Sequence, residues 1–405
     1  MYIKRDIESS IRKLSSFFPV LLVTGPRQVG KTTVLKNCAE PGRSFVSLDT
    51  LEIRELAQND PALFLQRYKT PLIIDEIQYA PQLFSYIKAA ADTDNIPGMF
   101  WLTGSQQFLL MKDVTESLAG RAGILNLQGF SYDEKFQKKS FPFIPDRTFI
   151  SRKENDCIGD GINAVYKQIW KGSYPRLYTA ADEFWEAFYS SYVQTYIERD
   201  VRSLTKIGSE TDFLKFMKAS AARIGNLLDY ADMAKDIGVS QPTVKAWISI
   251  LNASGIVYLL QPYSTNLTNR IVKTPKLYFM DTGLAAYLCG WKTPEVLETG
   301  AMNGAFFEDF VITEILKSFI HNGKAASLYF YRDKEKKEID LLIDENGMLY
   351  PVEIKKTAAP SKADISDFSV LDKLRISRGP GAVICMAQTH LPLTVSDTVI
   401  PVGYM

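Results

Sequence analysis

The chain has 405 residues, more than the roughly 250–300 at which one hydrophobic core stops growing, so we expect about two to four domains. Hydrophobic residues make up 46% of the sequence, which excludes long disordered stretches, and its 47 basic and 46 acidic residues nearly cancel, so overall charge neither requires nor excludes a nucleic-acid partner. The 4 cysteines are widely spaced and there are 2 histidines, which excludes a zinc-finger spacing and a histidine-rich metal site.

Residues 1–135 have the pattern of alternating strands and helices. Short apolar and β-branched runs separated by helical stretches predict a parallel sheet that is covered by helices on both faces. The expected strands are residues 20–23, 44–48, 72–74 and 99–103.

A glycine-rich loop follows the first expected strand. It fits the pattern G-x-x-x-x-G-K-[ST] at every position, and a helix is expected over residues 32–38. In such a loop the backbone N–H groups point at phosphate oxygens, the lysine reaches the outer phosphates and the hydroxyl joins a magnesium shell. The alternative, a chance match in a tight turn, does not account for the flanking strand and helix. The residues expected to bind ATP are Gly25, Pro26, Arg27, Gln28, Val29, Gly30, Lys31, Thr32 and Thr33.

Two acids, Asp75 and Glu76, end the third expected strand. An aspartate at a strand end can hold magnesium through water, and the adjacent glutamate can polarise the water that attacks the γ-phosphate. Many strands end in acids, so the pair is informative only together with the upstream loop. We expect Thr32 and Asp75 at the magnesium ion, and Glu76 and Lys31 as catalytic residues.

Polar residues also follow the fourth expected strand. Thr103 or Ser105 is in a position to sense the γ-phosphate and orient the water, and a simple turn is the alternative.

Arg121 follows in Leu118–Arg121, where it could reach a nucleotide of its own chain or of a neighbouring copy, or form a surface salt bridge. Arg176, Arg199 and Arg202 are further candidates to complete the ATP site.

These motifs resemble those of the AAA+ superfamily ATPases of bacteria and archaea, and above all a family in which such an ATPase precedes a C-terminal domain of unknown function. The resemblance extends to Gly172-Ser173-Tyr174-Pro175, where the family pattern usually has two glycines before Tyr-Pro, and to residues 196–200. It implies a helical lid, a nucleotide at subunit or domain junctions, and assembly into homo-oligomeric rings.

The middle of the chain predicts a winged helix-turn-helix. Residues 228–240 read as a helix, a glycine turn and a helix cap, and Ser240 and Pro242 begin a helix with an apolar stripe. A hairpin and a loop with Asn266, Asn269, Arg270 and Lys273 follow. Such a helix can enter the DNA major groove, but winged helices also pack against proteins, and Lys245 is the one basic residue on this helix.

The last hundred residues predict a cluster of carboxylates. Glu308 lies near the start of an expected helix, Asp340 lies on a strand, and Glu353 and Lys355 share one face of the next strand. A hairpin at residues 345–347 would place Asp340 beside Glu353, where two acids can hold a divalent cation and the lysine can orient or deprotonate a water.

This arrangement, with the later strand 381–385, resembles the PD-(D/E)XK nuclease fold. The resemblance implies metal residues Glu308, Asp340 and Glu353 and catalytic residues Asp340, Glu353 and Lys355. A surface hairpin with solvated charges is the alternative.

We therefore expect an α/β protein with a P-loop NTPase (AAA+) parallel sheet, a helical lid, a winged helix and a restriction-endonuclease-like domain. It should be soluble and cytoplasmic, without a signal peptide or membrane span, and should bind ATP, Mg²⁺ and DNA, with a second divalent cation at the C-terminal site. The rival hypothesis is a nucleotide-dependent switch or scaffold that binds proteins through its winged helix and carries an inactive nuclease fold. The expected domains are 1–135 (ATPase core), 136–204 (lid or linker), 205–290 (winged helix) and 300–405 (nuclease-like domain).

Overall fold

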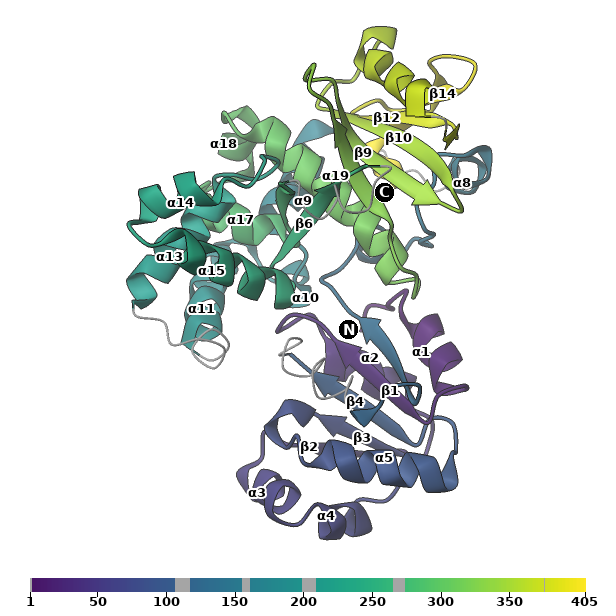
Figure 1. The fold of residues 1–405 in the computed structure, drawn as a ribbon, viewed down its shortest axis with the longest axis vertical. Helices are drawn as coiled ribbons and strands as arrows, with labels where there is room; N and C mark the ends of the chain where they lie inside the picture. Colours follow the sequence, from purple (N-terminus) through teal and green to yellow (C-terminus); the bar gives the residue numbers. More distant parts are fainter. Residues whose placement is uncertain (1, 106–116, 155–160, 199–208, 265–273, 375) are drawn as a thin grey trace. The chain divides into compact units, whose positions relative to one another are not determined.

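Figure 1 shows the computed structural model, which describes residues 2–105, 117–154, 161–198, 209–264, 274–374 and 376–405. The chain divides into two compact units. The first unit comprises residues 1–130, 253–255 and 320–324, and the second comprises 131–252, 256–319 and 325–405. The expected α/β architecture is confirmed, whereas the division into four domains stays a prediction.

A parallel sheet forms the centre of the first unit. Within its described residues, five strands pair in the order β2-β3-β4-β1-β5, and every pairing is parallel. β1 and β3 are buried along their whole length because helices cover both faces of the sheet. The strands are β1 (Val20–Thr24), β2 (Ser44–Ser47), β3 (Leu72–Asp75), β4 (Phe100–Gly104) and β5 (Ala122–Asn126).

The first four strands lie where the sequence predicts them, but β5 was not predicted. Its run Ala122–Asn126 contains a glycine and forms the edge of the sheet, where Ile124 remains 41% exposed. The pattern is therefore too weakly apolar to be read as a strand. The helices of this unit are α1 (Glu8–Ser15), α2 (Lys31–Cys38), α3 (Leu51–Asn59), α4 (Pro61–Arg67), η1 (Ile77–Tyr79) and α5 (Leu83–Asp94).

The second unit combines helices with a larger mixed sheet. Its sheet has the strand order β13-β14-β12-β10-β9-β8-β6-β7, and β11 pairs with β10. The strands are β6 (Val257–Pro262), β7 (Lys276–Phe279), β8 (Leu328–Arg332), β9 (Glu338–Glu345), β10 (Met348–Lys355), β11 (Ser377–Arg378), β12 (Gly381–Cys385), β13 (Leu391–Pro392) and β14 (Asp397–Pro401).

The helices of the second unit lie mostly in its N-terminal half. They are α7 (Tyr132–Lys135), α8 (Arg147–Lys153), α9 (Ile162–Lys171), α10 (Pro175–Tyr178), η2 (Asp182–Phe184), α11 (Trp185–Tyr196), α13 (Glu210–Ala221), α14 (Tyr230–Ile237), α15 (Gln241–Ala253), α17 (Thr282–Cys289), α18 (Pro294–Thr299), α19 (Asn303–Ile320), η4 (Lys362–Leu374) and η5 (Val402–Tyr404).

The predicted hairpin in the C-terminal region is confirmed. β9 and β10 pair antiparallel, and the turn residues Asn346 and Gly347 both have positive φ, 54° and 79°, as a tight two-residue hairpin requires. β12 then pairs parallel with β10, so the later strand expected at 381–385 is also confirmed. β6 pairs parallel with β8, which joins the hairpin predicted for the winged helix to the strands of the C-terminal region in one sheet.

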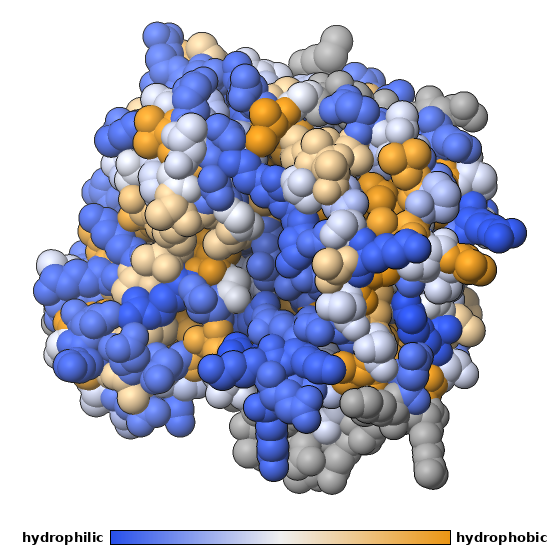
Figure 2. Space-filling model, turned by 90° about the horizontal axis from the view of Figure 1, so that it is seen from above, coloured by the Kyte–Doolittle hydropathy of each residue, from blue (hydrophilic) through white to orange (hydrophobic). Residues whose placement is uncertain are grey.

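None of the helices that the structure describes is long and apolar enough to cross a membrane. The face drawn in Figure 2 accordingly shows hydrophilic residues over most of its area, with hydrophobic residues scattered between them.

The Gly172-Ser173-Tyr174-Pro175 segment is a buried junction in the second unit. The Asp281 carboxylate accepts hydrogen bonds from the N–H (2.6 Å) and hydroxyl (2.7 Å) of Ser173, and from the Tyr189 hydroxyl (2.6 Å). A Cβ added at Gly172 would lie 2.1 Å from the Tyr189 oxygen. The serine that replaces the family's usual second glycine therefore has a structural role, because its side chain binds Asp281.

This junction predicts a large stability cost for Gly172→Ala. Gly172 has a φ of 81° and no room for a methyl group, whereas Gly238 has a φ of 82° but no atom within 4 Å of an added Cβ. We expect Gly172→Ala to lower the free energy of unfolding by about 3 kcal/mol or more, and Gly238→Ala by about 1 kcal/mol. Urea denaturation measures both. Gly172 also has a ψ of −165°, which at positive φ is nearly confined to glycine, whereas Gly238 has a ψ of 32°. Equal losses would contradict the extra cost that packing and backbone impose at Gly172.

Candidate functional site

The glycine-rich loop of the first unit connects β1 to α2. Gly25 has a φ of 146°, and a Cβ at this position would lie 2.0 Å from the Leu127 carbonyl oxygen. Gly30 is left-handed, with a φ of 94°, and immediately precedes α2. Both glycines are therefore required by the backbone path, which brings the start of α2 to the carboxyl end of β1. N–H groups at such a helix start favour bound phosphate.

The side chains of the loop are held from two directions. The Lys31 ammonium donates hydrogen bonds to the carbonyl oxygens of Gly25 (2.9 Å) and Pro26 (2.8 Å). Arg5 donates to the carbonyl oxygens of Val29 (2.9 Å) and Gln128 (2.8 Å). Pro26 and Val29 are buried, Arg27 is half-buried, and Gln28 and Thr33 are exposed. Arg5 was not predicted, because an arginine before the first helix has no distinctive pattern.

Asp75 lies at the centre of the polar groups near this loop. Its Oδ1 accepts hydrogen bonds from the hydroxyls of Thr32 (2.7 Å) and Thr103. The three residues come from α2 and from the ends of β3 and β4, which are neighbours in the parallel sheet. The structure thus brings together the predicted magnesium residues Thr32 and Asp75, and adds Thr103 to them.

Glu76 is held beside Asp75 in an unusual backbone conformation. Its φ of 55° and ψ of 49° are left-handed, which is uncommon for a residue other than glycine. The N–H and hydroxyl of Ser105 both lie 3.3 Å from Glu76 Oε2, and Gln78 also donates to this oxygen. Ser105 therefore contacts the predicted catalytic base, and Thr103 contacts the predicted metal residue.

Arg121 does not lie near the loop of its own chain. Its carbonyl accepts from the N–H of Val20, at the amino end of β1, whereas the loop follows the carboxyl end of this strand. The guanidinium pairs with Asp92 on the surface and donates to the Ala119 carbonyl oxygen (3.0 Å). The salt-bridge alternative describes this arrangement, and a role at the ATP site would require a second copy of the chain. Arg199 and Arg202 lie outside the described residues.

In the second unit, Asp340 and Glu353 lie on the paired strands β9 and β10. Val352 pairs with Leu341, so the next residues along the two strands, Glu353 and Asp340, lie opposite each other. Asp340 Oδ2 accepts a hydrogen bond from the N–H of Ile354 (2.9 Å). Burial and the neighbouring Asp340 carboxylate raise the pKa of Glu353 to about 8. The Lys355 ammonium lies 2.6 Å from Glu353 Oε1. The predicted juxtaposition of the two acids and the lysine is confirmed.

The charge of Lys355 is influenced by the same two carboxylates. Its burial lowers the pKa, but the carboxylates of Asp340 and Glu353 outweigh this effect and raise it above the ordinary value. The ammonium form of Lys355 is therefore stabilised beside these two carboxylates.

Glu308 has other partners than those predicted. Its Oε1 accepts from the Tyr278 hydroxyl (2.6 Å) and lies 3.4 Å from the Lys276 ammonium, which also pairs with Glu338 (2.6 Å). Burial and the charge of Asp340 raise the pKa of Glu308 to about 7. In the part of the chain that the structure describes, no three Asp, Glu, His or Cys side chains converge as a metal site.

Of the three predicted metal acids, the structure places Asp340 and Glu353 side by side and gives Glu308 other partners. The physical reason is that β7 supplies Lys276 and Tyr278, which hold Glu308. Sequence reasoning missed both residues, because they precede Glu308 by about thirty positions and lie in a segment assigned to the winged helix.

The helices α13, α14 and α15 and the hairpin of β6 and β7 have the order predicted for a winged helix. Ser240 caps α15 through the N–H of Thr243 (3.3 Å), and Val244, Trp247, Ile248 and Leu251 are buried as expected. Arg223, which follows α13, pairs with Asp232 and Asp236 on α14. The predicted wing residues Asn266, Asn269, Arg270 and Lys273 lie outside the described residues.

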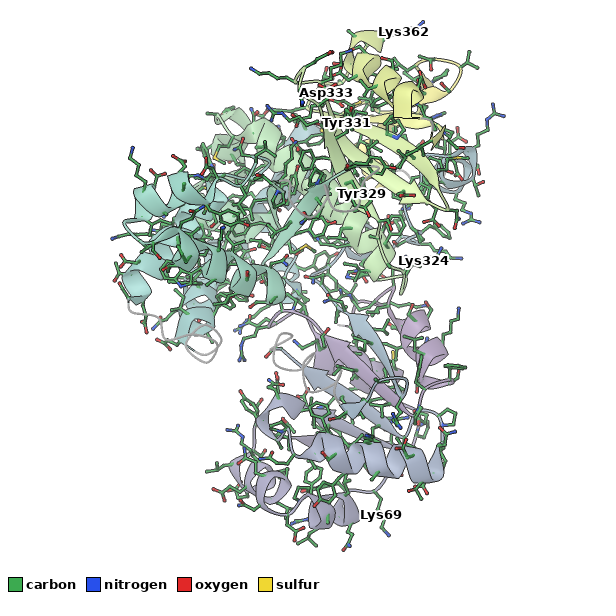
Figure 3. All side chains as sticks on the ribbon, viewed as in Figure 1. Lys69, Lys324, Tyr329, Tyr331, Asp333 and Lys362 are labelled. Atoms are coloured by element: carbon green, nitrogen blue, oxygen red, sulfur yellow. The ribbon has the colours of Figure 1, made fainter. Side chains whose placement is uncertain are left out.

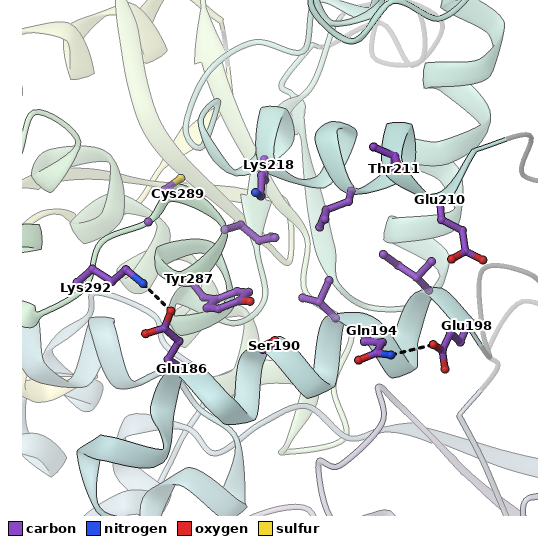
Figure 4. A pocket seen from close by; sticks show the side chains of 15 residues that line it. Glu186, Ser190, Gln194, Glu198, Glu210, Thr211, Lys218, Tyr287, Cys289 and Lys292 are labelled. Carbon is purple, nitrogen blue, oxygen red and sulfur yellow. Dashed lines mark hydrogen bonds and ion pairs between the residues drawn. The ribbon is translucent and has the colours of Figure 1, made fainter.

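A hollow of about 730 Å³ opens between α11, α13 and α17 (Figure 4). Glu186 and Lys292 form an ion pair at one end (2.5 Å), and Gln194 donates to Glu198 at the other (3.0 Å). The hollow contains none of the predicted site residues. These two pairs lie at opposite ends of the hollow and do not converge on a common point.

Comparisons with known proteins divide the chain into three segments. Residues 18–136 match the model of an AAA domain, residues 162–295 match a domain of unknown function (DUF8612), and residues 303–405 match another (DUF4143).

Two relatives match nearly the whole chain. Uncharacterized proteins of Mycobacterium tuberculosis and Mycobacterium bovis are each 28% identical to it over 403 residues, which is 98% of this chain and 83% of theirs. Among solved structures, the chain is similar to the Walker-type ATPase of Pyrococcus abyssi, with a TM-score of 0.42 and 15% identity over 71% of this chain and 96% of that one. RuvB of Thermotoga maritima has a TM-score of 0.30 and 18% identity over 62% of this chain and 85% of that one.

Proposed function

Because the chain belongs to the AAA+ P-loop ATPases that carry a C-terminal domain of unknown function, we propose that it hydrolyses ATP in its first unit and acts on DNA with its second. The observation that carries the proposal is the hydrogen-bonded set of Thr32, Asp75 and Thr103, with Glu76 directly beside it. This set lies at the loop whose backbone N–H groups would hold the phosphates.

The residues around Asp75 fit magnesium. A hydroxyl and a carboxylate are hard oxygen donors of the kind that Mg²⁺ prefers, and the two lie 2.7 Å apart. When bound, the ion would neutralise charge that develops on the phosphates. Thr32 and Asp75 would hold it, Asp75 through water, and Thr103 would keep the carboxylate in place.

Glu76 acts on the attacking water. As a carboxylate held by Ser105 and Gln78, it accepts a proton from the water as the water approaches the γ-phosphorus. Lys31 moves from the Gly25 and Pro26 carbonyl oxygens to the outer phosphates, which offer a stronger, charged acceptor. The loop thus exchanges hydrogen bonds with itself for hydrogen bonds with the nucleotide.

In the second unit, Asp340, Glu353 and Lys355 support a metal-dependent nuclease activity. The two carboxyl groups present oxygen donors on neighbouring strands, a chemistry that suits Mg²⁺ or Mn²⁺. A bound divalent cation would polarise a phosphodiester. Lys355 would orient the attacking water from its place beside Glu353.

A nucleotide-dependent scaffold is the second candidate. It is favoured by the pairing of Arg223 with Asp232 and Asp236, which leaves few basic groups on the described face of α14 and α15 for DNA phosphates. Under this hypothesis the winged helix binds a protein and the carboxylate pair cleaves nothing.

Replacement of two residues tests the ATP site. Glu76→Gln removes the base but keeps the side-chain shape, so we expect ATP to bind normally while turnover falls by about a hundredfold or more. Lys31→Ala should weaken ATP binding itself, because the phosphates lose a charge-assisted contact. Fluorescent-nucleotide titration and phosphate release give the two readouts. Wild-type turnover in the Glu76→Gln protein would falsify the assignment.

The action on DNA is tested with the divalent metal present. We expect the protein to cleave DNA with Mg²⁺ or Mn²⁺, and Asp340→Ala and Lys355→Ala to abolish the cleavage without loss of ATP hydrolysis, because the two sites use different residues. Lys324→Ala, in a lysine that contacts neither site, is the control. Absence of cleavage together with an ATPase rate that DNA does not alter would reject the DNA proposal in favour of the scaffold.

A further inference from the structure

The carboxylate pair in the second unit has a neighbour that carries a permanent positive charge. Lys276 is 4% exposed, and its ammonium lies between Glu338 (2.6 Å) and Glu308 (3.4 Å). It comes from β7, a strand outside the β8–β10 group to which Asp340 and Glu353 belong. A buried lysine is costly unless carboxylates surround it, so these contacts fix the position of the charge.

Tyr278, two residues further on the same strand, contacts the same acid. Alternation along β7 places Lys276 and Tyr278 on one face, and the tyrosine hydroxyl donates to Glu308 Oε1 at 2.6 Å. Glu308 Oε1 therefore accepts hydrogen bonds from both the Lys276 ammonium and the Tyr278 hydroxyl. Both contacts hold the Glu308 carboxyl group at β7 through its Oε1.

We propose that Lys276 and Tyr278 complete the nuclease-like site, with the Lys276 ammonium as the cation of Glu308, so that a divalent metal ion binds at Asp340 and Glu353 without Glu308. The proposal rests on the metal site of the proposed function and assigns to it a positioning residue that the nuclease-like motif does not contain.

The charges of the cluster agree with this arrangement. Four carboxyl groups (Glu308, Glu338, Asp340 and Glu353) lie with two ammonium groups (Lys276 and Lys355) and with the Arg332 guanidinium, which is 3.5 Å from Glu338 Oε2. With every group ionised, one negative charge remains without a counterpart, so the cluster favours a bound cation. A second metal ion would have to displace Lys276 from Glu308 and Glu338, at the cost of an uncompensated buried ammonium.

Lys276 should lower the affinity of the site for a metal ion, which a residue that only stabilises the fold would not do. Its positive charge repels a cation at Asp340 and Glu353, and its contact withdraws Glu308 from the metal. Removal of the ammonium should therefore strengthen metal binding, whereas removal of a residue that only supports the fold should weaken it.

The test is titration of the full-length protein with Mn²⁺. The Mn²⁺ that binds to the wild-type protein but not to the Asp340→Asn variant is assigned to the carboxylate cluster. We expect Lys276→Met to raise the Mn²⁺ affinity by about tenfold or more. In the double variant Lys276→Met/Glu308→Gln this gain should disappear, because the released carboxylate is absent and its lost negative charge offsets the lost ammonium. Lower affinity in Lys276→Met, or a gain that persists in the double variant, would overturn the proposal.

Lys337→Met is the matched control. Lys337 precedes Glu338 in the turn that follows Tyr331 and Asp333 (Figure 3), and within the described part of the chain it has no ion pair. The Lys337→Met substitution therefore removes one positive charge, as Lys276→Met does, but leaves the contacts of Glu308 unchanged. We expect its Mn²⁺ affinity to change by less than about threefold. A gain as large as that of Lys276→Met would show a general field effect and reject the specific role.

A second variant covers the case in which Lys276→Met does not fold. Glu308→Gln in the wild-type background should lower Mn²⁺ affinity by less than about tenfold, the lower limit for an outer-shell partner. A larger loss would identify Glu308 as a direct ligand and overturn the proposal. None of these readouts requires cleavage, so a protein that binds Mn²⁺ as expected but cleaves no DNA would reject the proposed function alone.

Discussion

The parallel register of β1, β3 and β4 is the constraint on which the ATP site depends. Parallel strands in neighbouring positions end at the same edge of the sheet, so residues that follow them in sequence meet in space. Thr32, Asp75 and Thr103 are far apart in the chain, yet both hydroxyls donate to one carboxylate oxygen. A shift of one residue in the register of β3 would turn Asp75 to the opposite face and remove both hydrogen bonds.

The second unit reaches a comparable convergence by antiparallel pairing. The Asn346-Gly347 turn fixes the register of β9 and β10, and this register sets Asp340 opposite Glu353. β6 then joins the same sheet beside β8, which allows β7 to bring Lys276 to Glu308. The hairpin expected to serve only a winged helix therefore also supplies side chains to the carboxylate cluster.

Local patterns predicted most of the fold and of the ATP site. The loop from Gly25 to Thr32 and the strand before Asp75 have spacings that few other structures produce, and the Asn346-Gly347 turn has the residues that its backbone requires. Ser240 and the apolar stripe of α15 likewise follow from local physics. In each case the residues that determine the structure are close together in the sequence.

What could not be predicted depends on contacts between distant segments. Arg5 holds the loop by donating to backbone carbonyl oxygens. Every residue has a carbonyl oxygen, so the sequence does not indicate which residues Arg5 contacts. Lys276 and Tyr278 hold Glu308 across the sheet, and Arg121 faces Asp92 at the edge opposite the loop. Edge strand β5 was missed for a different reason, because its exposed face weakens the apolar pattern.

The most direct test of the account is a crystal structure with magnesium and a non-hydrolysable ATP analogue. The account predicts that the Lys31 ammonium leaves the Gly25 and Pro26 carbonyl oxygens for the outer phosphates, while Thr32 and Asp75 hold the ion and Glu76 faces the γ-phosphate. An analogue bound elsewhere, or a Lys31 that keeps its contacts with the loop carbonyls while the phosphates lie beyond its reach, would contradict it.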